Sequence, residues 1–236
     1  MKTIALCCLY LVLATPVYAE WAADLALVSN YQVKGFSLNP GPALQPSLQW
    51  QAAETGPWTG VAAGIWLSNT HFQPDTTLPT IDSEIDWRVG KRWTFTPSKY
   101  CELNFLRYQF SGAQKASLNN YSEWQFGCGN SQEFLQLAYS AHYAFTRDRH
   151  LIISYTKQLF TKGSWLFDAE FNHLQNLDTG DFYQKRTASG YQDIQLSASF
   201  IPTAESWSVK ALLGTANESS PLAHAWYSNV QLSWHF

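Results

Sequence analysis

Residues 226–236 read WYSNVQLSWHF, in which apolar and polar side chains alternate up to the last residue of the sequence. One parity of this stretch holds Trp226, Val230, Leu232, Trp234 and Phe236. A period of two predicts a β-strand with one apolar and one polar face. An unpaired apolar edge would invite association with other chains, whereas a closed membrane barrel has no edge. The stretch therefore favours the last strand of an outer-membrane β-barrel over the edge strand of a secreted β-sandwich.

The beginning of the sequence has the pattern of an export signal. A basic start at Lys2 precedes an apolar run over residues 4–14, and Val17–Ala19 is a small-x-small cleavage site. The run is too short to span a bilayer, so we expect residues 1–19 to be a removed signal peptide. Residues 20–236 are then a single domain that keeps two cysteines, Cys101 and Cys128.

The composition is that of a protein with little charged surface. Charged residues make up 14% of the chain, against about 25% in an average soluble protein. The formal net charge of −3 excludes the basic balance of a nucleic-acid-binding protein. No stretch after the signal is long and apolar enough for a membrane helix. No cysteine or histidine spacing indicates a metal site, and we expect no cofactor.

Strand-like segments separated by turn signals recur along the whole mature chain. About twelve are expected, at residues 23–33, 43–51, 58–67, 81–93, 100–110, 120–128, 134–145, 150–160, 165–174, 191–201, 207–213 and 224–236. The connections between them alternate between short and long, as periplasmic turns and external loops do in barrels. We therefore predict an all-β fold, an antiparallel transmembrane β-barrel with both termini in the periplasm. Trp beside most of the short connections fits an aromatic belt at one membrane interface.

The two cysteines fit this arrangement. A hairpin centred between residues 114 and 115 places Cys101 opposite Cys128 and Leu103 opposite Phe126. A disulfide between directly opposed strand residues is geometrically feasible in an exported protein. The alternative is two free thiols that pack against each other.

Three stretches near the N-terminus resemble a known family. They are SNYQVKGFS at residues 29–37 followed by PALQ at residues 42–45, the segment Gly64–Asn69, and the acidic alternation over residues 82–86. They resemble the TorF family of porin-type outer-membrane proteins, and the resemblance covers about residues 24–90. It implies an outer-membrane β-barrel of proteobacterial type with pore activity. Lys34 stands where the family usually has Arg.

If the apolar parity faces lipid, the other parity lines the lumen and is rich in acids. The predicted pore-lining residues are Asp82, Glu84, Asp86, Arg88, Glu102, Glu123, Asp168, Glu170 and Lys210. Charge of one sign biases a pore toward ions of the opposite sign. A conducting lumen would then prefer cations or small neutral solutes. The alternative is that these side chains form a hydrogen-bonded plug across a narrow barrel.

The sequence thus favours a non-enzymatic, porin-like channel for passive diffusion of small solutes in the cell outer membrane. Its expected partners are membrane lipid, small solutes or ions, and the barrel-assembly machinery, which would read Leu232, Trp234 and Phe236. Two other classes stay open: a non-conducting barrel that presents its loops, and a lipid-modifying hydrolase. The hydrolase would need a serine beside a histidine; the candidate histidines are His71, His142, His150, His173 and His224.

Overall fold

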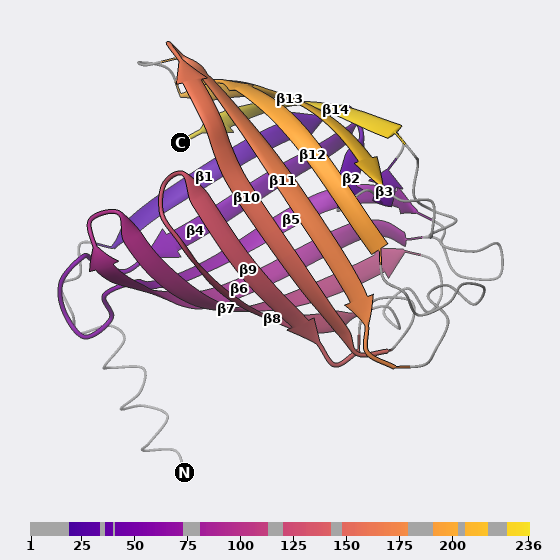
Figure 1. Cartoon of the computed structure of the whole chain (residues 1–236). Helices are drawn as coiled ribbons and strands as arrows, with labels where there is room; N and C mark the ends of the chain where they lie inside the picture. Colours follow the sequence, from indigo (N-terminus) through magenta and orange to yellow (C-terminus); the bar gives the residue numbers. More distant parts are fainter. Residues whose placement is uncertain are drawn as a thin grey trace.

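The chain folds into a closed antiparallel β-barrel (Figure 1). The computed structural model describes residues 19–33, 36–39, 41–72, 81–112, 120–142, 148–178, 191–202, 206–216 and 226–236. The barrel wall contains β1 (Glu20–Val28), β4 (Ala43–Gln51), β5 (Val61–Phe72), β6 (Ile81–Thr96), β7 (Lys99–Gly112), β8 (Tyr121–Gly129), β9 (Glu133–Ser140), β10 (His150–Lys162), β11 (Trp165–Asn176), β12 (Tyr191–Phe200), β13 (Trp207–Ala216) and β14 (Trp226–His235). Two short strands, β2 (Tyr31–Val33) and β3 (Phe36–Asn39), form a separate two-stranded sheet.

The predicted all-β barrel is confirmed, and each predicted strand overlaps one strand of the wall. The first strand is the main correction. We expected one strand over residues 23–33, but β1 ends at Val28, and the chain bends at Ser29 and Asn30 before β2. The expected signal peptide lies outside the described residues except for Ala19.

The two ends of the barrel differ in their connections (Figure 1). Tight turns join β6 to β7, β8 to β9 and β10 to β11 at one end, which we call the short-turn end and which also holds the connections from β4 to β5 and from β12 to β13. The remaining connections, which include none of these tight turns, lie at the other end, the long-loop end. The first residue of β1 and the last residue of the chain both lie at the short-turn end, where Phe236 and Ala23 exchange two backbone hydrogen bonds. No described helix is long and apolar enough to cross a membrane.

The alternation of side chains separates an outer from an inner surface of the wall. On β9, Leu135 and Leu137 are exposed, whereas Ala138 and Ser140 are each only 1% exposed. Aromatic residues gather on the outer surface near the short-turn end, where Trp21 pairs with Trp50 and Trp207 with Trp234. Such rings suit a membrane interface because one side of them is apolar and the indole N–H is polar.

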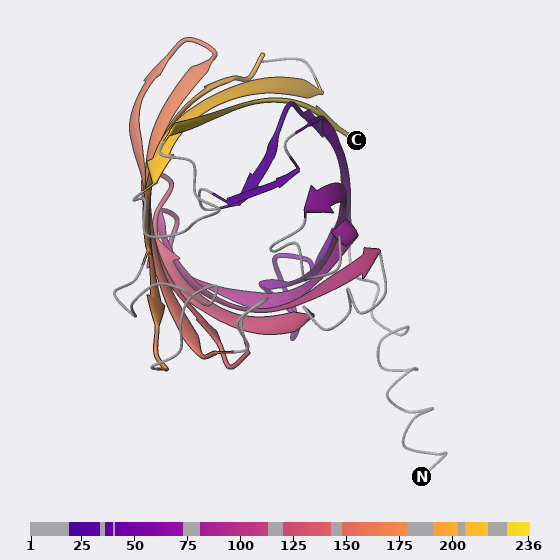
Figure 2. The ribbon, with the colours of Figure 1, turned by 90° about the vertical axis from the view of Figure 1, so that its right-hand side faces the viewer.

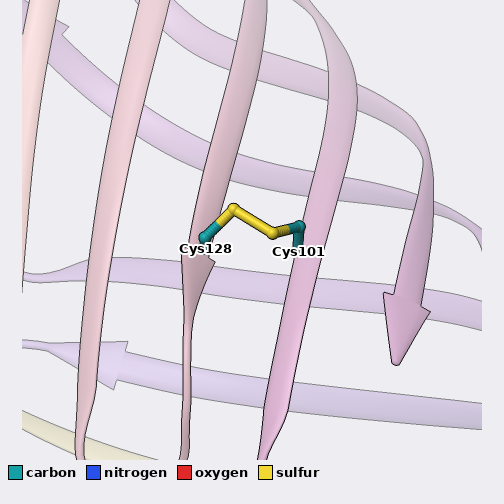
Figure 3. Close-up of a disulfide and its surroundings, with 2 residues drawn as sticks. All are labelled: Cys101 and Cys128. Carbon is teal, nitrogen blue, oxygen red and sulfur yellow. A yellow bond between two sulfur atoms is a disulfide. The ribbon is translucent and has the colours of Figure 1, made fainter. Parts of the chain in front are cut away.

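A disulfide joins β7 to β8 on the outer-facing parity (Figure 3). Cys101 is directly opposite Cys128, and Leu103 is opposite Phe126, as the sequence predicts. The bond links residues 27 apart in sequence.

One irregularity in β6 changes which side chains face the lumen. The pairing of β6 with β7 shifts by one residue between Ile81 and Ser83. A bulge of this kind re-aims the side chains beside it. Ile81 is therefore buried inside the barrel at 1% exposure, and Asp82 is exposed at the bulge.

Candidate functional site: the lumen

The long-loop half of the lumen is filled by protein. Figure 2 looks into this end and shows the sheet of β2 and β3 lying inside the ring of strands. Tyr31 and Leu38 of this sheet are each 8% exposed, and the Tyr31 ring packs 5.4 Å from the ring of Trp66. The buried cluster around them consists of Val28, Tyr31, Leu38, Ala43, Ile81, Phe110, Tyr121, Ala138, Ile152, Leu174 and Tyr227. We call the sheet of β2 and β3 the luminal hairpin. The luminal hairpin and the buried cluster together form an apolar plug that closes this half of the barrel.

The short-turn half of the lumen contains a cavity of about 1080 Å³. Its lining mixes polar and apolar side chains and comes mainly from β4, β5, β6 and β7, with Trp66 and Asp86 among its residues. At the short-turn end the cavity reaches the turn between β4 and β5, where Gly60 has a φ of 79° and accepts a hydrogen bond from the amide of Arg92. A Cβ at this glycine would lie 2.0 Å from the Arg92 carbonyl oxygen, so only glycine fits.

Three carboxylates of the wall lie near the boundary between the two halves. Glu84 is 3% exposed and accepts a hydrogen bond of 2.9 Å from the Tyr31 hydroxyl of the luminal hairpin. Asp86 is bonded to Glu84 and lines the cavity. Glu123 is 0% exposed, and its Oε1 accepts hydrogen bonds from Gln125 and Tyr108. Among the ion pairs of the described residues, none includes any of these three carboxylates.

The basic residues of the cavity pair with a different acid. Glu102 accepts two hydrogen bonds from Arg92, at 3.2 and 3.0 Å, and lies 3.6 Å from Arg88. Asn104 also donates to Glu102 and accepts from Arg88. The Arg92 guanidinium lies 4.2 Å from the centre of the Tyr100 ring. Each arginine therefore has its charge engaged near Glu102.

The opposite wall carries a second polar network. Asp193, 0% exposed, accepts hydrogen bonds from Tyr227, Gln195 and Asn172. Asn172 also donates to Glu170 at 2.8 Å. Asp168 and Lys210 interact electrostatically on the same wall. Both oxygens of Asp193 accept a hydrogen bond, whereas Asp86 Oδ1 and Glu123 Oε2 near the luminal hairpin are buried without a hydrogen-bond partner.

The structure thus distributes the predicted pore-lining residues over three places. Glu84, Asp86 and Glu123 lie near the hairpin; Arg88 and Glu102 lie in the cavity; Asp168, Glu170 and Lys210 lie on the opposite wall. Asp82 belongs to none of these groups because of the bulge. The sequence analysis did not select Arg92, although it continues the parity of Asp86 and Arg88.

Tyr31 and Tyr227 were also not selected. Their partners, Glu84 and Asp193, come from distant parts of the chain, and nothing in the local sequence marks them.

A chain of hydrogen bonds links three strands across the closure of the barrel. The Ser208 hydroxyl lies 3.2 Å from His235 Nε2, and His235 Nδ1 bonds to Asp24. This serine–histidine–aspartate order was not anticipated, because His235 was not among the candidate histidines. Of those, His150 is fully buried and bonds to the Asp148 carbonyl oxygen, His71 and His142 are exposed, and His224 lies outside the described residues.

An ion pair fastens the wall at the long-loop end. Asp178 accepts hydrogen bonds from the Arg149 amide at 2.7 Å and from Arg149 Nε at 2.8 Å. These bonds lower the pKa of the Asp178 carboxyl below its ordinary value. The contact joins the chain just before β10 to the chain just after β11.

Comparison with solved structures shows which known fold the barrel matches. An outer-membrane channel from Pseudomonas putida F1 aligns with a TM-score of 0.56 and 10% identity, covering 94% of this chain and 97% of that one. The NanC porin aligns with a TM-score of 0.55 and 6% identity, covering 89% and 97%. The KdgM porin, solved in complex with disordered oligogalacturonate, aligns with a TM-score of 0.50 and 8% identity, covering 91% and 98%. No protein-family model and no curated protein matches the sequence. The chain therefore has the fold of porin-type outer-membrane barrels.

Proposed function

We propose that the protein is an outer-membrane channel for passive diffusion of small solutes, with a preference for cations. The observation that carries the proposal is the cavity of about 1080 Å³ inside a closed barrel, whose lining includes Asp86, Arg88, Arg92 and Glu102. A cavity of that size could admit small solutes from the short-turn end. The luminal hairpin lies beyond it and would have to move for a solute to pass.

The charges on the inner parity support the preference for cations. The acids are Asp24, Glu84, Asp86, Glu102, Glu123, Asp168, Glu170 and Asp193, and the bases are Arg88, Arg92 and Lys210. Acids outnumber bases, and the two arginines are engaged by Glu102. Surplus negative charge in a pore lowers the energy of a passing cation and raises that of an anion.

Ion current through the refolded protein in a planar bilayer tests this function. Under a salt gradient we expect discrete current steps with a reversal potential of cation-selective sign. A barrel that inserts correctly, as judged by heat-modifiable mobility on gels, but stays silent would contradict the channel function. It would favour a structural barrel that presents its loops.

We also propose placement in the outer membrane, with the short-turn end in the periplasm, and membership of the TorF family. Support for the family comes from the sequence motif at residues 29–37, since the solved neighbours share only the fold. The C-terminal strand would be the signal for the barrel-assembly machinery. Replacing Phe236 with Ala should then sharply reduce heat-modifiable barrel in the outer membrane. An unchanged amount would contradict a signal role, and Trp226→Ala on the same face of β14 is the matched control.

An acyl hydrolase is the second candidate, favoured by the contact chain of Ser208, His235 and Asp24. In such an arrangement the histidine accepts the serine proton and the aspartate holds the histidine in place. Covalent labelling of the refolded protein by a fluorophosphonate tests it. Labelling that disappears in Ser208→Ala and in His235→Ala would establish a reactive serine. The control Ser233→Ala keeps Ser208 and should label as the wild type does. Labelling of the folded protein no greater than that of heat-unfolded wild type would contradict the hydrolase, and the three contacting residues would then only fasten the barrel seam.

A further inference from the structure

We propose that Glu84, Asp86 and Glu123, together with the tyrosine and tryptophan rings beside them, bind a small organic ammonium compound. The inference deepens the proposed channel function and rests on it, because it names the class of solute that the lumen would take. The site lies at the inner end of the cavity, against the luminal hairpin.

Burial is the first argument for a ligand. Glu123 is 0% exposed and Glu84 is 3% exposed, yet Oε2 of Glu123 and Oδ1 of Asp86 are buried without a hydrogen-bond partner. A buried polar atom costs free energy unless a donor meets it, and a buried charge costs more. Two such oxygens in one cluster of acids call for donors, and an acidic cluster favours donors that carry positive charge.

The protein's own donors near this cluster are already committed elsewhere. The Tyr31 hydroxyl donates to Glu84. Gln125 donates to Glu123 Oε1, which is the other oxygen of the carboxylate that carries the unpartnered Oε2. Arg88, two residues from Asp86 on the same face, donates instead to Asn104 and pairs with Glu102. The described side chains thus leave the two orphaned oxygens to an external donor.

Aromatic rings flank the carboxylates. Tyr31 bonds to Glu84 and packs against Trp66, which is part of the cavity lining. The Tyr108 hydroxyl lies 3.4 Å from Glu123 Oε1, and its ring stacks on that of Tyr121 with centroids 4.3 Å apart. The faces of such rings attract organic cations, and the attraction grows where water is excluded. Carboxylates and rings together suit an ammonium group on a short hydrocarbon chain.

The geometry disfavours a metal ion as the ligand. In the part of the chain that the structure describes, no group of three or more His, Cys, Asp or Glu side chains is arranged to hold a metal. A primary ammonium group needs only one or two protein oxygens, since water in the cavity can accept its remaining N–H groups. Asp86 lines the cavity, so a diamine that enters from the short-turn end meets this side chain first. Glu84 and Glu123 are buried, and the side chains around them would have to shift for the ammonium group to reach them.

Calorimetric titration of the refolded full barrel with 1,4-diaminobutane tests the site, with uncharged 1,4-butanediol as the matched compound. We expect saturable binding of the diamine and none of the diol. In the Asp86→Asn/Glu123→Gln variant the affinity should fall at least about tenfold, which corresponds to about 1.4 kcal/mol. The control variant Asp168→Asn/Glu170→Gln removes two carboxylates from the opposite wall and should bind the diamine as the wild type does.

Failure of the site and failure of the channel function give different results. No saturable diamine binding to correctly folded barrel, or equal binding by the Asp86→Asn/Glu123→Gln variant, would overturn the site even if the barrel conducts. Equal loss in both variants would also overturn it, because binding would then follow total lumen charge. Diamine binding that depends on Asp86 and Glu123 in a silent barrel would support the site while contradicting the channel.

Discussion

The two halves of the lumen are built from the same strands but differ in what they hold. The long-loop half contains the luminal hairpin and side chains such as Ile152 and Leu174, each 1% exposed. The short-turn half contains a cavity of about 1080 Å³, whose lining carries charged side chains such as Asp86 and Arg92. The difference shows that strand number alone does not decide whether a barrel is open. A short segment that leaves the wall after β1 closes one half and leaves the other free.

On the proposed channel function, the comparison also indicates where the barrier to conduction would lie. A solute that entered the cavity would meet Asp86 and Trp66 and then the hairpin, whose Tyr31 contacts Glu84 and Trp66. Passage would then depend on whether the hairpin leaves its place.

Loosening the hairpin should produce the largest effect. Tyr31→Ala combined with Leu38→Ala removes two buried side chains, each 8% exposed, from the plug. Loss of such packing costs about 3 kcal/mol or more, which shifts the docked-to-undocked equilibrium about a hundredfold. We expect longer open times and higher mean current in planar bilayers.

The matched control is Tyr139→Ala, which removes a ring from the outer surface, 39% exposed. Its current should equal that of the wild type. Equal currents in the hairpin variant and the wild type would mean that the hairpin is not the barrier.

The stability of the short-turn half, which we also call the open half, should depend on bonds within the wall, because few side chains pack against this part of the wall from inside. Cys101→Ala combined with Cys128→Ala opens a loop of 27 residues. The chain-entropy model predicts a loss of roughly 3 kcal/mol in the free energy of unfolding. Guanidinium titration followed by gel mobility measures this loss.

A reducing agent provides the internal control for the disulfide. It should lower the midpoint of the wild type and leave the double variant unchanged. A wild type that is insensitive to reductant and no more stable than the variant would show that the bond does not support the open half.

Ion selectivity should depend on the acids near the hairpin more than on the acid at the bulge. A unit charge about 4 Å from a passing ion in a water-like medium is worth about 1 kcal/mol. Glu84→Gln/Asp86→Asn should then lower the cation-to-anion permeability ratio about fivefold, measured from the reversal potential. Asp82→Asn should change it little, because Asp82 is exposed at the bulge. The reverse order of effects would contradict the assigned positions.

The smallest effect concerns the rim of the filled half. Hydrogen bonds from Arg149 lower the pKa of the Asp178 carboxyl. The pair therefore contributes its full stabilisation above the ordinary carboxyl pKa of about 4. This stabilisation is lost as the pH falls through the lowered pKa. Asp178→Asn should reduce the hydrogen-exchange protection of the Leu177 amide, which bonds to the Arg149 carbonyl oxygen. The difference from wild type should vanish at low pH. A difference that persists there would assign it to another contact.

The sequence predicted the wall well where alternation is regular. β4 has the expected bounds, Ala43–Gln51, and the expected opposition of Cys101 and Cys128 is confirmed. In these strands each side chain lies on either the outer surface or the lumen side of the wall, so the period of two carries the structural information.

Alternation was uninformative where the chain leaves the wall or slips in register. Tyr31 continues the parity of Leu25 and Leu27, so the sequence shows one strand where the structure has β1 and a luminal hairpin. Ile81 shares the parity of Ile85 but faces inward because of the bulge. For the site, the sequence indicated which side chains face inward. It could not indicate contacts such as that of Tyr31 with Glu84, because the two residues are 53 positions apart and no local pattern links them.

The disulfide has a consequence for how the barrel is assembled. A one-residue slip between two strands would exchange the lipid-facing and lumen-facing side chains of one of them. Cys101 and Cys128 are directly opposed, so the bond between them is compatible with a single alignment of β7 on β8. Once the bond forms, that hairpin can no longer sample misaligned pairings. It can serve as the fixed template from which the alignment of neighbouring strands propagates around the wall.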